Sequence, residues 1–246
     1  MFDLEMFFEE NGIGAKEIWD AEEISHIEPV LSGELTDAVP GLDQAVVYGD
    51  PFTLGDTLDY QQGFDNPYGA FGTCGLTSVA NVGTMAGLDI TEPEVVDFAM
   101  NNNLCEKPGD GVLGGGVIIS QTLKILSHYR LDSHCEMADV ASPNRLAECI
   151  EGGHGVILGV NSGIMQGRDW KVLDKNREIT TTHYVTLTGT VRDAESGEIK
   201  GFYMCDSSAA RSDAGSLFVS LDLLKKGYTD VKGAHAIITN DPIRKC

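Results

Sequence analysis

The chain of 246 residues has little positive charge and no long apolar run. It holds 17 Lys and Arg against 38 Asp and Glu, which gives a formal net charge of −21. Nucleic acids and anionic membrane surfaces attract basic patches, so this balance argues against both partners. No apolar run approaches the roughly 18–20 residues that a membrane-spanning helix needs. We therefore expect no nucleic-acid partner and no membrane insertion.

A secretory signal and paired cysteines are also missing. The first residues, MFDLEMFFEENG, are acidic and lack an apolar core or a small-residue cleavage site. The expected location is the cytoplasm of the producing cell, or the target of a dedicated secretion system. The cysteines, at positions 74, 105, 135, 149, 205 and 246, include no Cys-x-x-Cys pair. This spacing predicts free thiols, and we expect neither a metal nor a cofactor.

Charge divides the chain into two parts. Residues 1–60 hold 15 Asp and Glu against Lys16 alone, a net charge of −14, and residues 61–246 carry the remaining −7. Apolar residues at helical spacing predict one or two short helices in the first part, followed by an extended linker rich in Pro and Gly. The acidic segment is interpreted as a solvated face, as a docking surface for a basic protein partner, or as a mask over the second part.

The second part changes from helical patterns to strand patterns along its length. Helices are expected over 74–87, 91–102, 117–129 and 142–152, and strands over 155–160, 183–191, 197–206, 216–220 and 234–239. Helices followed by antiparallel strands are typical of the α+β class. The sequence therefore predicts an α+β fold, with a helical half, an antiparallel sheet and the acidic N-terminal extension.

One cysteine stands in a setting that favours reactivity. Cys74 lies where a loop meets an expected helix, with Gly72 and Gly75 close by. A helix N-terminus lowers the pKa of a thiol, and a nearby imidazolium lowers it further. His183 opens one expected strand and Asp206 ends the next, so a hairpin would bring them together. We therefore predict a catalytic triad of Cys74, His183 and Asp206, in which the carboxylate orients the imidazole.

These stretches resemble motifs of the bacteriocin-processing, double-glycine-leader peptidases, the C39-like branch of the papain-like cysteine hydrolases. TCGLTSVANV is similar to their Cys-Gly-x-x-(Ser/Ala) helix start, and HYVTLTG to their His-Tyr-Val-Val-x-x-Gly strand. FYMCDSS resembles their strand ending in Asp, and GVILGV the strand before the histidine. The resemblance covers about residues 60–240. It implies a papain-like cysteine protease fold for residues 61–246 and a protein or peptide substrate cleaved through a thioester.

The expected oxyanion hole departs from the family pattern. The family places a Gln six residues before the cysteine, where this chain has Tyr68. Gln61 and Gln62 lie further upstream, and a longer loop would deliver one of them. We favour Gln62, acting with the backbone amide of Cys74. The alternative, that both glutamines are surface loop residues, stays open.

Other functions remain open on the same fold. A peptidoglycan amidase, a protein deamidase or a transglutaminase-like acyl transferase would use the same thiol. Without a membrane span or nucleotide-binding domain, the chain is typical of a bacterial effector or toxin domain, or of a stand-alone processing protease. The displaced glutamine also leaves room for a catalytically silent binding module, in which the acidic segment 1–60 is the working surface.

Overall fold

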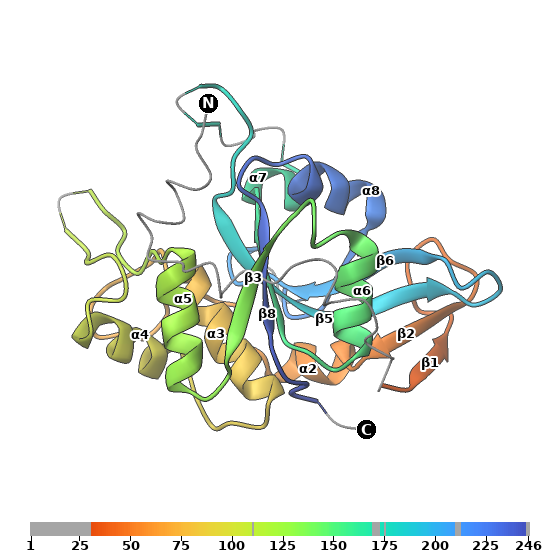
Figure 1. Ribbon diagram of the computed structural model, residues 1–246, viewed down its shortest axis with the longest axis horizontal. Helices are drawn as coiled ribbons and strands as arrows, with labels where there is room; N and C mark the ends of the chain where they lie inside the picture. Colours follow the sequence, from red (N-terminus) through yellow and green to blue (C-terminus); the bar gives the residue numbers. More distant parts are fainter. Residues whose placement is uncertain (1–30, 110, 169–172, 175, 210–212, 245–246) are drawn as a thin grey trace.

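The computed structural model describes residues 31–109, 111–168, 173–174, 176–209 and 213–244 (Figure 1). Helices and one antiparallel sheet form an α+β architecture, which confirms the predicted fold class. The short helices expected near the N-terminus fall within residues 1–30 and lie outside the described residues. Among the helices of the described residues, none combines the length and apolar character needed to cross a bilayer.

A long strand, β5 (His183–Asp193), organises the sheet. Its first half pairs with β4 (Val156–Val160) and its second half with β2 (Ala45–Gly49). The other edge of β5 pairs with β6 (Ile199–Cys205), the next strand in sequence. All these pairs are antiparallel, so the β5–β6 hairpin expected from the sequence is confirmed.

Four further strands extend the sheet from these partners. Beyond β4 lie β8 and β3, beyond β2 lies β1, and beyond β6 lies β7. Their bounds are β1 (Gly33–Thr36), β3 (Ser133–Met137), β7 (Leu217–Ser220) and β8 (His235–Thr239). The strands expected over 216–220 and 234–239 are thus present, whereas β1 and β3 have no counterpart in the predicted set.

The expectation of an extended linker is wrong for residues 31–60, which form regular secondary structure. They contain β1, β2 and the helix α2 (Pro51–Thr57), and β2 pairs with the far half of β5. The partner of β2 is some 145 residues away in sequence, and four-residue β1 is mostly exposed. Local periodicity cannot report such a pairing, because the partner strand supplies the hydrogen bonds and the buried surface.

Buried polar residues explain why β3 escaped prediction. His134 and Glu136 alternate with apolar positions on this strand, yet both are buried. Glu136 accepts hydrogen bonds from Arg145 at 3.0 Å and contacts His134 at 3.0 Å. The network satisfies polar groups that a hydrophobicity pattern assigns to the surface. The strand is therefore a product of tertiary contacts with α6 (Pro143–Glu151).

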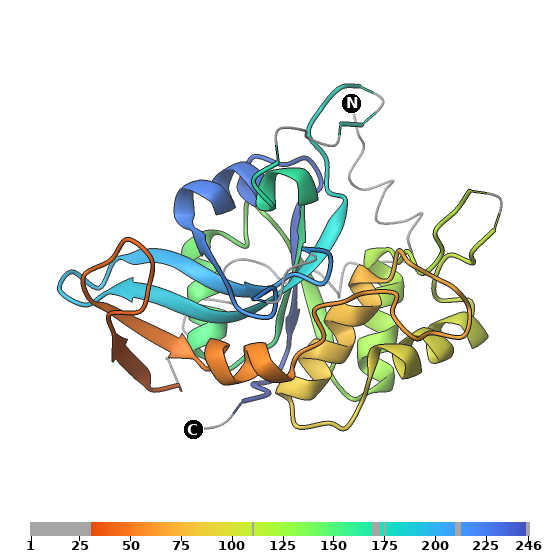
Figure 2. The ribbon, with the colours of Figure 1, turned by 180° about the vertical axis from the view of Figure 1, so that it is seen from behind.

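Helices cover both faces of the sheet. The first group is α3 (Cys74–Met85), α4 (Glu92–Asn101) and α5 (Ile119–His128), whereas α6 lies on the opposite face. Successive side chains of a strand point to opposite faces. Accordingly Ile157 and Tyr184 pack with the first group, and Leu158 and Val185 with α6. Figures 1 and 2 show α3, α4 and α5 at one end of the molecule and β1 and β2 at the other.

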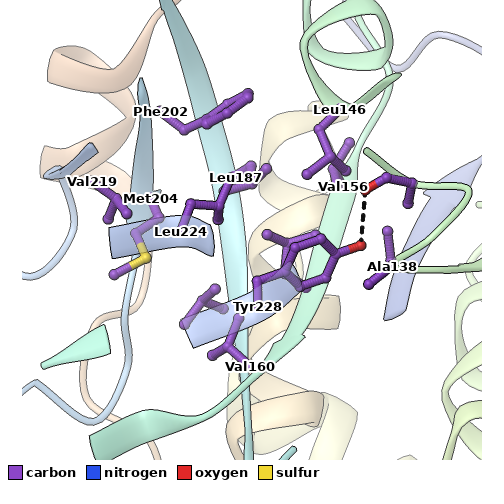
Figure 3. Close-up of a cluster of buried hydrophobic side chains, with 14 of the residues drawn as sticks. Ala138, Leu146, Val156, Val160, Leu187, Phe202, Met204, Val219, Leu224 and Tyr228 are labelled. Carbon is purple, nitrogen blue, oxygen red and sulfur yellow. Dashed lines mark hydrogen bonds between the residues drawn. The ribbon is translucent and has the colours of Figure 1, made fainter. Parts of the chain in front are cut away.

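The core beneath α6 is completed by the C-terminal part of the chain. Tyr228, on the π-helix Lys225–Thr229 that follows α8 (Leu221–Leu224), is fully buried among side chains of β4, β5 and β6 (Figure 3). Its hydroxyl donates a hydrogen bond to the carbonyl of Ala141 at 3.2 Å. A buried tyrosine needs such an acceptor, so this contact fixes the segment that leads into β8.

Candidate active site

Cys74 is the first residue of α3, as predicted, and its side chain is half-buried. The helix start lies directly against β5. A Cβ atom at Gly75 would stand 2.3 Å from Val117 Cγ2 and 3.2 Å from the ring of Tyr184. Only glycine lets the first turn fit so closely against both Val117 and β5. The thiol is therefore held beside the beginning of β5, where His183 is located.

The β5–β6 hairpin brings His183 and Asp206 together. Thr186 of β5 pairs with Cys205 of β6, so Asp206 emerges at the end of the hairpin where β5 begins. The distance from His183 Nε2 to Asp206 Oδ1 is 2.8 Å, and the two residues are 5 % and 0 % exposed. With Nε2 held by the carboxylate, Nδ1 is the ring nitrogen left to face Cys74.

The buried histidine and carboxylate stabilise each other's charge. Burial disfavours the imidazolium, but hydrogen bonds and charges from Asp206 and Cys74 outweigh it and raise the pKa of His183 to about 10. Burial also opposes ionisation of Asp206, yet the contact with His183 and the amide of Ser208 lower its pKa to about 2. The pair is therefore charged across the neutral range.

His183 also activates the thiol. Burial alone raises the pKa of Cys74, but the hydrogen bond and charge of His183 outweigh it, helped by the N–H groups of Tyr184 and Gly75. The net effect lowers the pKa of the Cys74 thiol below its ordinary value. Burial instead raises the pKa of the other thiols that the structure describes, to about 12 at positions 135, 149 and 205. Within the described residues, Cys74 alone is thus poised to form a thiolate.

Two residues that the sequence did not single out complete the surroundings of Asp206. Ser208 donates its backbone N–H to Asp206 Oδ1 at 2.9 Å, and its hydroxyl lies 3.2 Å from His183 Nε2. Gln166, the C-cap residue that follows α7 (Ser162–Met165), donates to Asp206 Oδ2 at 3.1 Å and to Ser208 Oγ at 2.7 Å. No local sequence signal marks Gln166 as a neighbour of Asp206.

Gln62 lies between the chain entering Cys74 and the chain leaving Asp206. Its side-chain amide donates to the Phe71 carbonyl at 2.8 Å, and its backbone N–H donates to the Ser207 carbonyl at 3.0 Å. The Ser207 hydroxyl donates to Gln62 Oε1 at 3.1 Å. A carboxamide has two N–H donors, so one donor is available in addition to the one that binds Phe71.

The other polar residues that could serve as oxyanion donors make contacts away from the site. Gln61 is exposed, and its backbone N–H donates to Asp59. The hydroxyl of Tyr68, six residues before Cys74, donates to Asp97 of α4 at 2.6 Å. Asn161, another polar residue with a buried side chain, caps α7 by accepting from the N–H of Ile164. Of these residues, only Gln62 contacts both the chain that leads to Cys74 and the chain that follows Asp206.

The oxyanion role expected for Gln62 predicts that the Gln62→Ala variant turns its substrate over about 100-fold more slowly at saturation, the usual cost of losing one oxyanion donor. The effect should fall on kcat, because the donor is needed where negative charge develops on the carbonyl oxygen. Steady-state kinetics on one substrate measure the change in kcat. Gln61→Ala is the matched control and should keep wild-type kcat. Equal losses in both variants would contradict the assignment of Gln62.

The glycine-rich segment 111–116 lies against the chain that leads to Cys74. Phe71 donates its N–H to the Leu113 carbonyl at 3.0 Å, and Gly72 to the Gly114 carbonyl at 2.8 Å. Gly115, with φ +85°, passes Thr73 so closely that an added Cβ would lie 2.4 Å from its side chain. The glycines thus allow the backbone of this segment to lie close to the backbone of residues 71–73. The side chains of Phe71 and Leu113, on the two paired segments, are 58 % and 64 % exposed beside the site.

No cluster of metal-binding side chains is present in the part of the chain that the structure describes. In the described ranges, no group of three or more His, Cys, Asp or Glu side chains is placed to hold a metal ion. A surface cavity of about 660 Å³, lined by residues 41–44 and 193–195, lies at the opposite end of β5. It shares no residue with the Cys74 site.

Comparison with known proteins returns structural likenesses only. No protein-family model and no curated protein matches the sequence. A crystal structure provisionally described as a C39-like peptidase from Bacillus anthracis is 15 % identical and covers 77 % of this chain and 96 % of its own, with a TM-score of 0.47. A double-glycine motif protease from an AMS/PCAT transporter, in complex with the leader peptide, is 16 % identical and covers 68 % and 84 %, with a TM-score of 0.41. At TM-scores below 0.5, these likenesses assign no activity to this chain.

Proposed function

We propose that this protein is a cysteine peptidase, or a related thiol hydrolase, that cleaves a peptide or amide bond with Cys74, His183 and Asp206. One observation carries the proposal. A buried His183–Asp206 pair, 2.8 Å apart, lies beside a thiol whose pKa it lowers at the start of a helix. A cysteine that only packs in the core gains nothing from a His–Asp pair or from a lowered pKa. A catalytic nucleophile needs both, because the thiolate is the form that reacts.

The geometry supports acyl transfer in two steps. The Cys74 thiolate attacks the substrate carbonyl, and the negative charge on oxygen is received by the Cys74 N–H and the Gln62 amide. His183 gives its Nδ1 proton to the leaving amine, and a thioester to Cys74 remains. His183 then takes a proton from water, which attacks the thioester and releases the acid and the free thiol.

The residues around Asp206 keep the imidazole productive. Asp206 Oδ1 accepts from His183 and Ser208, while Gln166 donates to Oδ2. With both carboxylate oxygens bound, the carboxylate cannot rotate away from the ring. The imidazole therefore keeps Nδ1 directed at the thiol through both proton transfers.

The surface beside the nucleophile supports a peptide as substrate. Large apolar side chains are mostly buried in folded proteins, yet Phe71 and Leu113 remain exposed on the two paired segments next to Cys74. Phe64, on the loop that carries Gln62, is 65 % exposed as well. These three side chains offer contacts for apolar substrate residues near the scissile bond.

Selective alkylation tests the proposal without a known substrate. At pH 7 we expect iodoacetamide to modify Cys74 at least about 100-fold faster than the buried thiols, because the thiolate is the reactive form. The Cys246→Ser variant is used, since Cys246 lies outside the described residues. Mass spectrometry of peptide fragments gives the rate at each cysteine. Comparable rates at Cys74 and Cys149 would count against the proposal.

Hydrolysis assays then define the bond that is cleaved. Peptide libraries and soluble peptidoglycan fragments are incubated with the protein, and the products are identified by mass spectrometry. Cleavage of library peptides supports the peptidase reading, whereas cleavage of cell-wall fragments alone would move the assignment to an amidase. If neither is cleaved and Cys74 is not selectively alkylated, the proposed hydrolase activity fails.

A further inference from the structure

A buried carboxylate of α4 contacts both ends of the loop that precedes the nucleophile. Glu92 is 1 % exposed. Its Oε1 accepts a hydrogen bond from the N–H of Gly63 at 2.7 Å and another from the hydroxyl of Thr73. Gly63 directly follows Gln62, and Thr73 directly precedes Cys74. One oxygen atom therefore joins the two neighbours of the proposed oxyanion donors.

Helix α4 does not need Glu92 in order to start. Thr91 and Glu94 already form a capping box, in which Glu94 accepts from the N–H of Thr91 at 2.8 Å. The capping box satisfies the helix start with exposed groups. The inward direction of Glu92 thus requires another reason.

Burial makes the position of Glu92 costly. Its Oε2 is buried without a hydrogen-bond partner within the described residues. Burial raises the pKa of this carboxyl group, an effect that the bonds from Thr73 and Gly63 oppose and the charge of Asp59 reinforces. A buried polar atom without a partner is rare in folded proteins and calls for an explanation. The two contacts made by Oε1 provide one.

We propose that Glu92 is a positioning residue that fixes Gln62 relative to Cys74. The inference rests on the proposed function, because it concerns the oxyanion donors of that site. Donors stabilise a transition state only when they are held at hydrogen-bond distance from the oxygen that becomes charged. The loop 61–73 has no regular secondary structure, so its backbone needs an external anchor. Glu92 supplies that anchor from a rigid helix.

A second tether helps to separate this role from general packing. Tyr68, in the middle of the loop, donates to Asp97 one helical turn and a half further along α4. That contact lies at the surface, where one hydrogen bond contributes little. Glu92 is the buried tether, and it contacts the two ends of the loop that adjoin Gln62 and Cys74.

The test compares variants of the first turn of α4. In Glu92→Leu, kcat should fall about 100-fold, as for one lost oxyanion donor, with KM changed less than about threefold. Alkylation of Cys74 by iodoacetamide should stay within about threefold of wild type, because this reaction needs the thiolate and no oxyanion hole. Glu92→Gln keeps an acceptor oxygen and should restore most of kcat. Glu94→Ala breaks the exposed capping box instead, so it should lower the melting temperature and leave kcat unchanged.

Two further variants protect the test against misfolding and indirect effects. Thr73→Val removes only the hydroxyl donor and should lower kcat in the same direction even if Glu92→Leu does not fold. The double variant Gln62→Ala/Glu92→Leu should be no slower than Gln62→Ala, because Glu92 acts through the position of that side chain. The inference would be overturned if the losses in kcat of the two single variants multiplied in the double variant. It would also be overturned if Glu94→Ala lost as much kcat as Glu92→Leu.

Amide hydrogen exchange decides the inference independently of activity. Exchange in residues 61–73 should rise in Glu92→Leu, while exchange in the β5–β6 hairpin stays at its wild-type level. If the wild-type protein hydrolyses no substrate, the proposed function fails, and faster exchange in 61–73 still supports the positioning role. Unchanged exchange in that segment would refute the role even in an active enzyme.

Discussion

Peptide hydrolysis by the Cys74→Ala variant is expected to be about 10⁴-fold slower than by the wild type, or slower still, as when other hydrolases lose their nucleophile. The loss should appear in kcat, because alanine removes the atom that forms the thioester. The helix start and the His183–Asp206 contact do not depend on the thiol. The variant should therefore fold, bind substrate and fail only in chemistry.

A matched cysteine separates catalysis from packing. Cys105 is 7 % exposed, and burial raises the pKa of its thiol. The Cys105→Ala variant should therefore keep wild-type kcat, although it loses some buried apolar contact. Both variants are compared by kcat, KM and melting temperature on one substrate. Residual activity in Cys74→Ala above about one hundredth of wild type would contradict a nucleophilic role, since triad members act as a unit.

Loss of the nucleophile also has an electrostatic consequence. The contact with Cys74 helps to raise the pKa of His183, next to the larger effect of the hydrogen bond with Asp206. The pKa of His183 should therefore fall in Cys74→Ala but stay above that of an isolated imidazole. NMR titration of the His183 ring measures this shift without any substrate.

The parts of the site that the sequence predicted are those fixed by local pattern and by nearest-neighbour topology. The helix start at Cys74 follows from the loop-to-helix change, and the contact of His183 with Asp206 follows from two consecutive strands. A hairpin between neighbouring strands is the least demanding pairing in a sheet. The sequence is therefore sufficient to predict the contact between these two residues, which are 23 positions apart.

The parts that escaped prediction depend on long-range burial of polar groups. Gln166 reaches Asp206 across 40 residues, and Glu92 reaches Thr73 across 19. A polar side chain on a helix end is normally solvated, so its sequence context indicates a cap and gives no hint of a buried partner. Only the three-dimensional packing of α4 and α7 around the site reveals these contacts.

Replacing Asp206 with asparagine is expected to lower kcat about 10³–10⁴-fold, as in other triads that lose the carboxylate but keep its shape. Asparagine can hold the ring by a hydrogen bond, but it carries no charge to stabilise the imidazolium. The thiolate–imidazolium pair is then less populated. In addition, an amide N–H placed toward Nε2 favours the wrong tautomer, with the proton on Nδ1 facing the thiol.

The dependence of rate on pH distinguishes this loss from simple misfolding. The active form needs a protonated His183, whose pKa is about 10, so the wild-type rate should fall only as the pH rises through about 10. Asp206 contributes the largest of the effects that raise this pKa. In Asp206→Asn the alkaline limb of the pH–rate profile, where the rate falls as the pH rises, should therefore move toward neutral pH. The variant then loses activity in a pH range where the wild type retains it.

A carboxylate at the other end of the same strand provides the control. Asp193 ends β5 and accepts hydrogen bonds from Ser196 at the hairpin turn, remote from Cys74. Asp193→Asn should lower stability slightly and leave both kcat and the alkaline limb unchanged. If Asp206→Asn lowered the rate by the same factor at every pH between 6 and 10, the carboxylate would be acting only as a structural support. A shifted limb instead identifies the charge of Asp206 as the cause, because a neutral isostere preserves the packing and removes only the field that holds His183 protonated.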